Sequence, residues 1–463
     1  MAASSTQAVS GTVDVGALLD GARIRPLHVA VILLCAAGMF ADGFDVQLMG
    51  YIAPAIIRAW HLKREALGPS FGAGLAGLMI GALVWSPLAD RFGRKPVILM
   101  GLALFGLLSL ATALATDIRS LVVLRFLTGL GLGGVMPNSV AMTSEWAPKK
   151  LRTTFVVLMW FGFTFGSGFG GSIAAALSQA YGWQSAFIFG GALPLALIPL
   201  LLATLPESPR VLVSKGAAPA RIAAVLKRFD SNLAVSDADR FVLTNQTQHR
   251  SVWTGLVGLF AEQRTAMTLL LWVMFFANLL ALYFLGNWMP TLMTEAGLTA
   301  TTAILATSMI HFGGLAGSLI LGAIVDRYNT FLVMMVSYLF AGFFTVIIGH
   351  AGDSAMLAVI FGFGAGFFIT GNQTCANALA ARLYPTNACA TGVGWALGVG
   401  RLGSVVGPVV AGMLLAIGWS TQSVFLAAGL PALLAAISVL ILGRVVTARN
   451  AAVPMAEQDR LTA

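Results

Sequence analysis

The chain has 463 residues, of which 58% are hydrophobic and only 10% are charged, less than half the charged share of an average soluble domain. A mean hydropathy of +0.87 together with 52 glycines excludes most water-soluble folds and also a disordered chain. The net charge of +9 does not indicate nucleic-acid binding, because the basic residues are spread among loops between apolar stretches. This composition indicates a protein that has lipid as part of its solvent.

Twelve stretches are long and apolar enough to cross a bilayer as helices, which takes about 20 residues each. The polar segment 205–264 separates the first six from the last six. We therefore predict a tail at 1–26, a six-helix bundle at 27–204, a linker at 205–264, a second six-helix bundle at 265–445 and a tail at 446–463. The predicted spans are 27–57, 68–89, 96–115, 121–143, 154–177, 183–204, 265–293, 300–324, 331–350, 355–379, 388–416 and 421–445.

The basic residues indicate the sidedness of the chain. If the N-terminus is cytoplasmic, most of the 27 Lys and Arg residues fall in cytoplasmic segments, and Arg58, Lys63, Arg64 and Arg119 are the basic residues of the outer loops. This bias is typical of membrane proteins and predicts that both termini are cytoplasmic. The three cysteines lie in or beside apolar segments without metal-ligand spacing, so we expect reduced thiols.

An internal repeat relates the two halves of the chain. Residues 88–91 (LADR) reappear as residues 324–327 (IVDR), each at the end of a Gly-rich span, and Pro148 corresponds to Pro385. Parallel repeats are a transporter architecture in which the substrate site lies near the middle of the bilayer, where the halves meet. The repeat therefore predicts two related bundles with a site between them.

Two loop motifs resemble a known family. Residues 87–96 (PLADRFGRKP) resemble the loop between the second and third helices of the major facilitator superfamily. Residues 206–210 (PESPR) resemble the stretch after the sixth helix in many members, sugar porters included. The resemblance implies an all-α membrane protein with twelve transmembrane helices in two pseudo-symmetric six-helix bundles.

The first motif places charges where they can control an opening at the cytoplasmic face. Asp90 can accept hydrogen bonds from a neighbouring helix N-terminus, while Arg91 and Arg94 stay at the anionic surface. We predict a latch that favours one open state, with Glu145 and Arg152 as a matching clasp in the next cytoplasmic loop. The alternative is a positive-inside anchor without a gating role.

Ionisable residues inside membrane spans are functional candidates because they are costly to bury. Asp42 and Asp45 lie one helical turn apart, close enough to share protons, as in a proton-coupled carrier. Either one could instead be the structural partner of a buried arginine. Arg125 lies near the outer end of its span, where it could extend to the interface or form an ion pair with Asp42 or Asp45.

Two further groups lie deeper in predicted spans. Arg401 follows about a dozen apolar or small residues of its helix, and its planar guanidinium suits a carboxylate. We predict that it anchors the substrate carboxylate, with a structural buried pair as the alternative. His311 could titrate in the physiological range or serve only in helix packing. No other histidine shares its helix at ligand spacing, so we expect no metal.

Together, the Asp-Gly-Phe-Asp run at 42–45 and the buried Arg125, His311 and Arg401 resemble the aromatic-acid/H⁺ symporters of the superfamily. The resemblance implies a bacterial inner-membrane carrier that imports benzoate, hydroxybenzoate or hydroxyphenylpropionate with protons for aromatic catabolism. It implies proton coupling by the two aspartates, charge balance and anion binding by the two arginines, and substrate contact or proton linkage by His311.

An aromatic ligand needs aromatic walls and a few polar groups. Aromatic residues at helical spacing are also common in packing or against lipid, and that alternative remains open for each. The candidates for ring contact are Phe44, Tyr283, Trp288, Phe367 and Trp395, and those for a ring hydroxyl are Asn278, Asn287, Asn372 and Gln373.

Other functions remain as alternatives. A sugar or drug carrier of the same fold is suggested by residues 206–210, and a nontransporting sensor of aromatic acids belongs to another class. The sequence has no nucleotide loop or nucleophile elbow, so we predict neither an enzyme nor a cofactor. We expect a monomer whose partners are a small aromatic carboxylate, protons and membrane lipid.

Overall fold

The structure, a computed structural model, describes residues 11–230, 232–233, 235–236, 239–244, 257–261, 264–384 and 388–452. Within them, twelve helices are long and apolar enough to cross a membrane, which confirms the predicted twelve-helix fold. Pro385, the predicted counterpart of Pro148, lies outside these ranges. The twelve helices are α2 (Pro26–Trp60), α3 (Gly68–Phe92), α4 (Arg94–Thr112), α5 (Ile118–Trp146), α6 (Arg152–Tyr181), α7 (Gln184–Thr204), α11 (Thr265–Glu295), α12 (Ala300–Arg327), α13 (Thr330–Ile348), α14 (Ala355–Leu383), α15 (Cys389–Ala416) and α16 (Thr421–Ala452).

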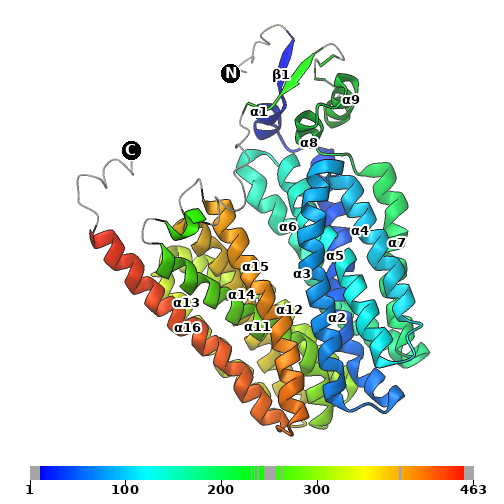
Figure 1. The fold of residues 1–463 in the computed structure, drawn as a ribbon, viewed down its shortest axis with the longest axis vertical. Helices are drawn as coiled ribbons and strands as arrows, with labels where there is room; N and C mark the ends of the chain where they lie inside the picture. Colours follow the sequence, from blue (N-terminus) through cyan, green and yellow to red (C-terminus); the bar gives the residue numbers. More distant parts are fainter. Residues whose placement is uncertain are drawn as a thin grey trace.

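The helices form two halves with the same internal packing (Figure 1). In the first half, α2–α7, the helix α2 packs on α6 and α3 packs on α5. In the second half, α11–α16, the equivalent pairs are α11 with α15 and α12 with α14. The same order of pairing in both halves confirms the two pseudo-symmetric bundles.

Glycines allow these paired helices to approach each other closely. A Cβ atom built at Gly162 of α6 would lie 2.1 Å from the Ala36 carbonyl oxygen of α2. In the second half, a Cβ built at Gly313 of α12 would lie 2.1 Å from the Phe363 carbonyl oxygen of α14. A side chain at either position would push the helices apart, so backbone contact makes each half a tightly packed unit.

The N-terminal segment and the linker fold together as a cap on the end of the first half at which α2 begins and α7 ends, here called the terminal end (Figure 1). Strand β1 (Thr12–Asp14) pairs in parallel with β2 (Arg240–Val242). Arg25 forms an ion pair with Asp230. The cap consists of these strands and the short helices α1 (Val15–Asp20), α8 (Pro209–Ser214) and α9 (Pro219–Phe229). The tail and the linker, which we predicted as separate segments, are thus joined in the structure.

The two halves meet at the other, distal end of the molecule. A Cβ built at Gly50 of α2 would lie 2.5 Å from the Gly286 carbonyl oxygen of α11. Arg64, in the 3₁₀ helix η1 (Arg64–Leu67), forms an ion pair with Glu295 at the end of α11. Figure 1 shows the helices of the two halves converging at this end and diverging towards the terminal end.

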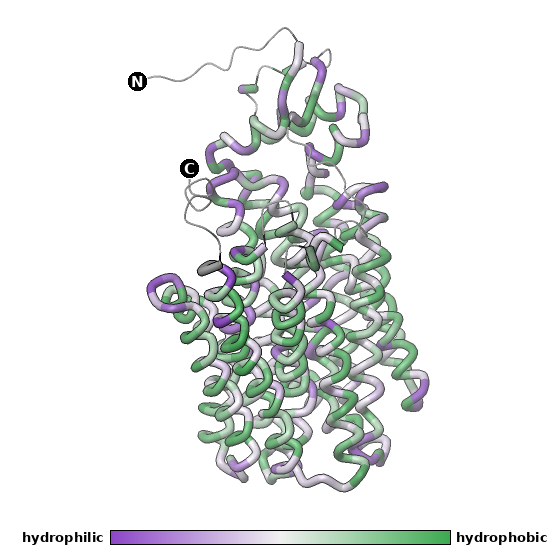
Figure 2. The backbone as a smooth tube through the Cα atoms, turned by 60° about the vertical axis from the view of Figure 1, so that its left-hand side comes forward, coloured by the Kyte–Doolittle hydropathy of each residue, from purple (hydrophilic) through white to green (hydrophobic). Residues whose placement is uncertain are grey.

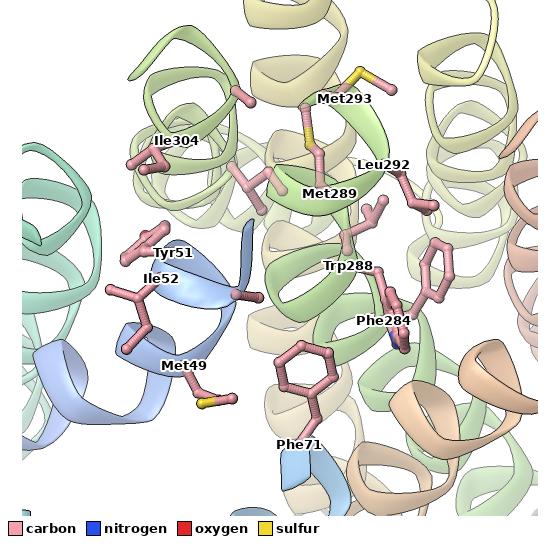
Figure 3. Packing of buried hydrophobic residues seen from close by; sticks show 14 of the residues in the cluster. Met49, Tyr51, Ile52, Phe71, Phe284, Trp288, Met289, Leu292, Met293 and Ile304 are labelled. Carbon is pink, nitrogen blue, oxygen red and sulfur yellow. The ribbon is translucent and has the colours of Figure 1, made fainter. Parts of the chain in front are cut away.

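An apolar core fills the distal contact between the halves. Met49 and Phe71 of the first half face Trp288 and Met289 of the second (Figure 3). Figure 2 shows that hydrophilic residues gather in the cap and at the helix ends, while the helices between them are largely hydrophobic. This distribution matches a bundle whose sides face lipid and whose ends face water.

Candidate functional site

The buried charged groups of the spans come from both halves. Asp42 and Asp45 lie on α2 and are fully buried, and Arg125 of α5 is 3% exposed. His311 lies on α12 and Arg401 on α15, near the middle of each helix. These groups therefore lie on four spanning helices, two from each half.

Asp45 and Arg125 form a buried ion pair within the first half. Arg125 donates from Nη2 to Asp45 Oδ2 at 2.7 Å and from Nη1 to Oδ1 at 3.3 Å. Ser109 of α4 donates to the same carboxylate at 3.1 Å, and the guanidinium lies over the ring of Phe187. Of the alternatives for Arg125, the structure has the ion pair, so each charge compensates the other.

Asp42 has a different environment from Asp45. Both of its carboxylate oxygens are buried, and neither has a hydrogen-bond partner among the described residues. The adjacent Gly43 lies against α6, where a Cβ would be 2.3 Å from the Phe163 carbonyl oxygen. Arg125 and Ser109 bind the Asp45 carboxylate, and no hydrogen bond joins Asp42 to Asp45 among the described residues. The sharing of protons between the two stays a prediction. A buried carboxyl without hydrogen-bond partners is costly to place in a span, which marks Asp42 as a functional candidate.

Arg401 reaches across the seam from the second half. It donates from Nη1 to the Tyr283 hydroxyl at 3.0 Å and from Nη2 to the sulfur of Met136, a residue of α5, at 3.3 Å. Neither partner is charged. In the part of the chain that the structure describes, this guanidinium forms no salt bridge, although it lies near enough to the Asp42 carboxyl to interact with it electrostatically. Its planar fork has no carboxylate bound to it, so it can bind one.

Several amide and imidazole side chains in the spans of the second half have unused hydrogen-bonding capacity. Both amide atoms of Asn372 are buried without a partner among the described residues, as is the Nε2 atom of His311. Asn278 donates to Gln373 at 2.8 Å and keeps a free oxygen by the same criterion. Buried polar atoms normally find partners, so each of these groups is a candidate for contact with a ligand.

Gln47 was not identified from the sequence. It lies on α2, 4% exposed, and its Oε1 atom has no partner within the described ranges. A Cβ at Gly286 would be 2.8 Å from that atom, so the side chain faces α11 across the seam. A single glutamine in an apolar span, little more than one turn after Asp42, is the signal that could have indicated it.

Most of the predicted aromatic wall serves packing in this conformation. Phe44 packs edge to face on Phe189 at 5.3 Å between ring centroids. Trp288 donates to the Pro408 carbonyl oxygen at 2.8 Å within the second half. Trp395 stacks on Trp272 and Phe367 lies edge-on to Phe368, while Asn287 donates to the Tyr283 carbonyl of its own helix. Of the predicted ring contacts, the structure joins Tyr283 to Arg401.

Charged residues at the terminal end pair differently from the prediction. Arg94 donates to Asp90 at 2.8 Å and to Glu145 at 3.2 Å. Arg152 does not join Glu145 and instead donates to Asp20 of the cap at 2.8 Å. The expected Glu145–Arg152 clasp is therefore replaced by two networks, because the cap supplies a carboxylate that the sequence did not place there.

Glu207 occupies the position that the sequence analysis gave to Asp90. Its carboxylate accepts from the backbone N–H groups of Arg94 at 3.1 Å and Lys95 at 3.4 Å, the first residues of α4. Burial raises the pKa of the Glu207 carboxyl, and these amide hydrogen bonds oppose that rise. Gly93 before the helix has φ +112. Arg91 lies over the Phe92 ring and takes no part in this network.

Buried charges between two six-helix halves are the arrangement of membrane transporters that alternate between two open states. The sequence profile of the Major Facilitator Superfamily matches residues 35–400 and 271–460. The chain belongs to this superfamily, whose members are transporters rather than enzymes.

Two characterised relatives and one solved structure illustrate the similarity. The gallate transporter of Pseudomonas putida is 40% identical over 93% of this chain and 95% of its own. The 4-hydroxybenzoate transporter PcaK of Pseudomonas aeruginosa is 39% identical over 93% and 96%. The partially occluded inward open structure of the xylose transporter XylE from E. coli superposes with a TM-score of 0.70, covering 89% of this chain and 97% of its own. At 16% identity this last match shows the fold alone.

Proposed function

We propose that the protein imports small aromatic carboxylates together with protons by alternating access. The observation that carries this proposal is the Arg401 guanidinium, which projects across the seam with only neutral partners, Tyr283 and Met136. A permanently charged group in that place has a carboxylate as its natural ligand. The substrates named for the relatives, gallate and 4-hydroxybenzoate, are carboxylates of this kind.

Asp42 is the proton carrier in this proposal. Its oxygens are buried without partners among the described residues, so ionisation there requires compensation by a nearby cation or by water. Asp45 already has Arg125 as a counter-charge and keeps the first half intact. His311 and Asn372, with unused polar atoms, are available to a ring hydroxyl. In this scheme Arg125 supports the site without touching the substrate.

The orientation of the chain follows from its basic residues. We assign the terminal end to the cytoplasm and the membrane to the bacterial inner membrane, on the bias of Lys and Arg. The conformation is then inward-facing, because the halves meet at the distal end. Bundles 27–204 and 265–445 would rock about the seam, with the linker 205–264 between them. One chain supplies both halves of the site, so a monomer suffices.

Uptake into proteoliposomes tests the proposal. Purified protein is reconstituted, and accumulation of radiolabelled 4-hydroxybenzoate is measured with and without an inwardly directed proton gradient. We expect accumulation only with the gradient. Arg401→Gln should lose transport, whereas Arg401→Lys, which keeps the charge but not the planar fork, should retain part of it. The matched control is Arg119→Gln, an exposed arginine of the distal end, which should transport normally.

A binding panel separates this proposal from the alternatives. Xylose and a cationic drug are tested beside 4-hydroxybenzoate, and stabilisation by either in place of the acid would indicate a sugar or drug carrier. Binding of the acid without any exchange across the vesicle membrane would indicate a sensor. Normal accumulation by Arg401→Gln would refute the role given to this residue.

A further inference from the structure

A cavity of about 420 Å³ opens at the distal end, away from the buried charges of the seam. The last turns of α2 and α6 and the turn before α7 form one side, and the first turn of α12 forms the other. Its volume falls in the range of small-molecule sites. The lining residues that bear on its chemistry are Tyr51, Arg58, Ser178, Gln179, Trp183 and Thr301.

Two aromatic side chains of the cavity lining, Tyr51 and Trp183, are firmly held. The Tyr51 hydroxyl donates to the Ser167 carbonyl at 2.6 Å, which fixes its ring. Trp183 packs edge to face on Trp60 at 5.3 Å between ring centroids. Figure 3 shows Ile304 of α12 beside Tyr51 of α2. These surfaces suit a flat, apolar ring.

The polar groups of the cavity favour an anion. Arg58 lines it and is held by a hydrogen bond from Nε to the Pro54 carbonyl oxygen at 3.2 Å. Ser178 adds a hydroxyl group. Thr301 accepts a hydrogen bond from Gln179 of α6 across the cavity and stands in the first turn of α12, where the helix dipole attracts negative charge. The walls and the charge together match an aromatic carboxylate.

We propose that this cavity is a second, outer binding site for aromatic carboxylates. This inference rests on the proposed function, which sets the distal end outside the cell and names the aromatic carboxylate as the transported substrate. Ala300, Thr301 and Ile304 belong to the second half and the remaining lining residues to the first. Separation of the halves at the distal end removes the α12 wall, so the site is complete only while that end is closed.

A ligand that binds only the closed form stabilises that form by mass action. At a ligand concentration ten times the dissociation constant, the ratio of closed to open form rises about tenfold. External substrate at high concentration therefore holds the carrier inward-facing and slows its return to the outward-facing state. The expected kinetic sign is uptake that rises with substrate, passes a maximum and then falls.

Isothermal titration of the purified full chain with 4-hydroxybenzoate tests the site directly. We expect two molecules bound by the native protein, one by Arg58→Gln, one by Arg401→Gln and two by the control Arg119→Gln. Ala59→Phe fills the cavity from an exposed helix end and should also bind one. A single molecule bound by the native protein, or two by both Arg58→Gln and Ala59→Phe, would overturn the outer site.

The same variants separate this inference from the proposed function. Arg58→Gln should keep the KM of uptake within about twofold, because Arg58 lies outside the central site. The decrease of the uptake rate at high substrate concentration should disappear, because the outer site no longer binds. If Arg401→Gln still binds two molecules while Arg58→Gln binds one, the central anchor is wrong and the outer site stands. If the uptake rate of Arg58→Gln still decreases at high substrate concentration and the variant binds two molecules, the inference of an outer site is wrong.

Discussion

The Asp45–Arg125 pair allows a sharp test of how buried charge is balanced. Asp45→Asn removes the carboxylate that accepts two Arg125 hydrogen bonds, at 2.7 and 3.3 Å, and one from Ser109 at 3.1 Å. The guanidinium is 3% exposed and is left without its counter-charge. Breaking a buried pair on one side costs about 3 to 5 kcal/mol of the free energy of unfolding.

The comparison variant is Asp42→Asn, on the same helix and equally buried. Its carboxyl has no partner among the described residues, so a neutral amide of the same shape should change the free energy of unfolding by less than about 1 kcal/mol. Denaturant unfolding of both variants in one detergent measures the difference. Arg125→Gln added to Asp45→Asn should restore part of the loss, because it removes the unpaired charge.

Two outcomes would refute this reasoning. Asp45→Asn and Asp42→Asn could prove equally stable, which would mean that water or lipid compensates Arg125 as well as Asp45 does. Alternatively, the second substitution could add its full cost to the first, which would mean that the two side chains do not interact.

The remaining predictions concern the cycle and the two ends of the molecule. Asp42→Asn should keep exchange of substrate at equal pH and lose accumulation driven by a proton gradient; accumulation at the native level would exclude Asp42 as the carrier. Gly93 has φ +112, and a Cβ there would lie 2.1 Å from a Glu207 oxygen, so Gly93→Ala should lower the free energy of unfolding by more than the strain of the backbone alone, about 1 to 3 kcal/mol. Gly216 has φ +64 and lies in open space, so Gly216→Ala should cost about 1 kcal/mol. Thermal unfolding compares the two variants, and equal losses of stability would contradict a role for the Glu207 contact. Arg64→Ala should change the free energy of unfolding by at most about 1 kcal/mol. It should nevertheless increase the labelling of a cysteine introduced at the distal end, because the ion pair between Arg64 and Glu295 holds that end closed. Unchanged labelling would show that this ion pair does not hold the distal end closed.

The number of spans follows from the properties of single residues, and for that reason the sequence could predict the twelve-helix fold. Hydrophobic length identifies each helix, and the 88–91 and 324–327 repeat indicated two equivalent halves. The packing of α2 on α6 was not predictable in the same way. It depends on Gly162 meeting a backbone carbonyl of another helix, and composition alone does not say which glycines face which helix.

The candidate site was partly predictable for a related reason. Each buried charge is visible in the sequence because it interrupts an apolar span. Which charge meets which is a property of the fold, so the choice of Asp45 over Asp42 as partner of Arg125 had to come from the structure. Glu207 was not predicted as a helix cap, because it lies more than a hundred residues along the chain from Arg94, whose backbone N–H donates to it.

The pairing of β1 with β2 has a consequence for biosynthesis. The first strand leaves the ribosome long before its partner, and all six helices of the first half are made between them. The strand therefore waits until residues 240–242 have been translated, and the pair closes over a half that is already inserted in the bilayer. A fusion partner attached directly before Thr12 would hinder this late pairing of β1 with β2, whereas one attached after the last helix would not.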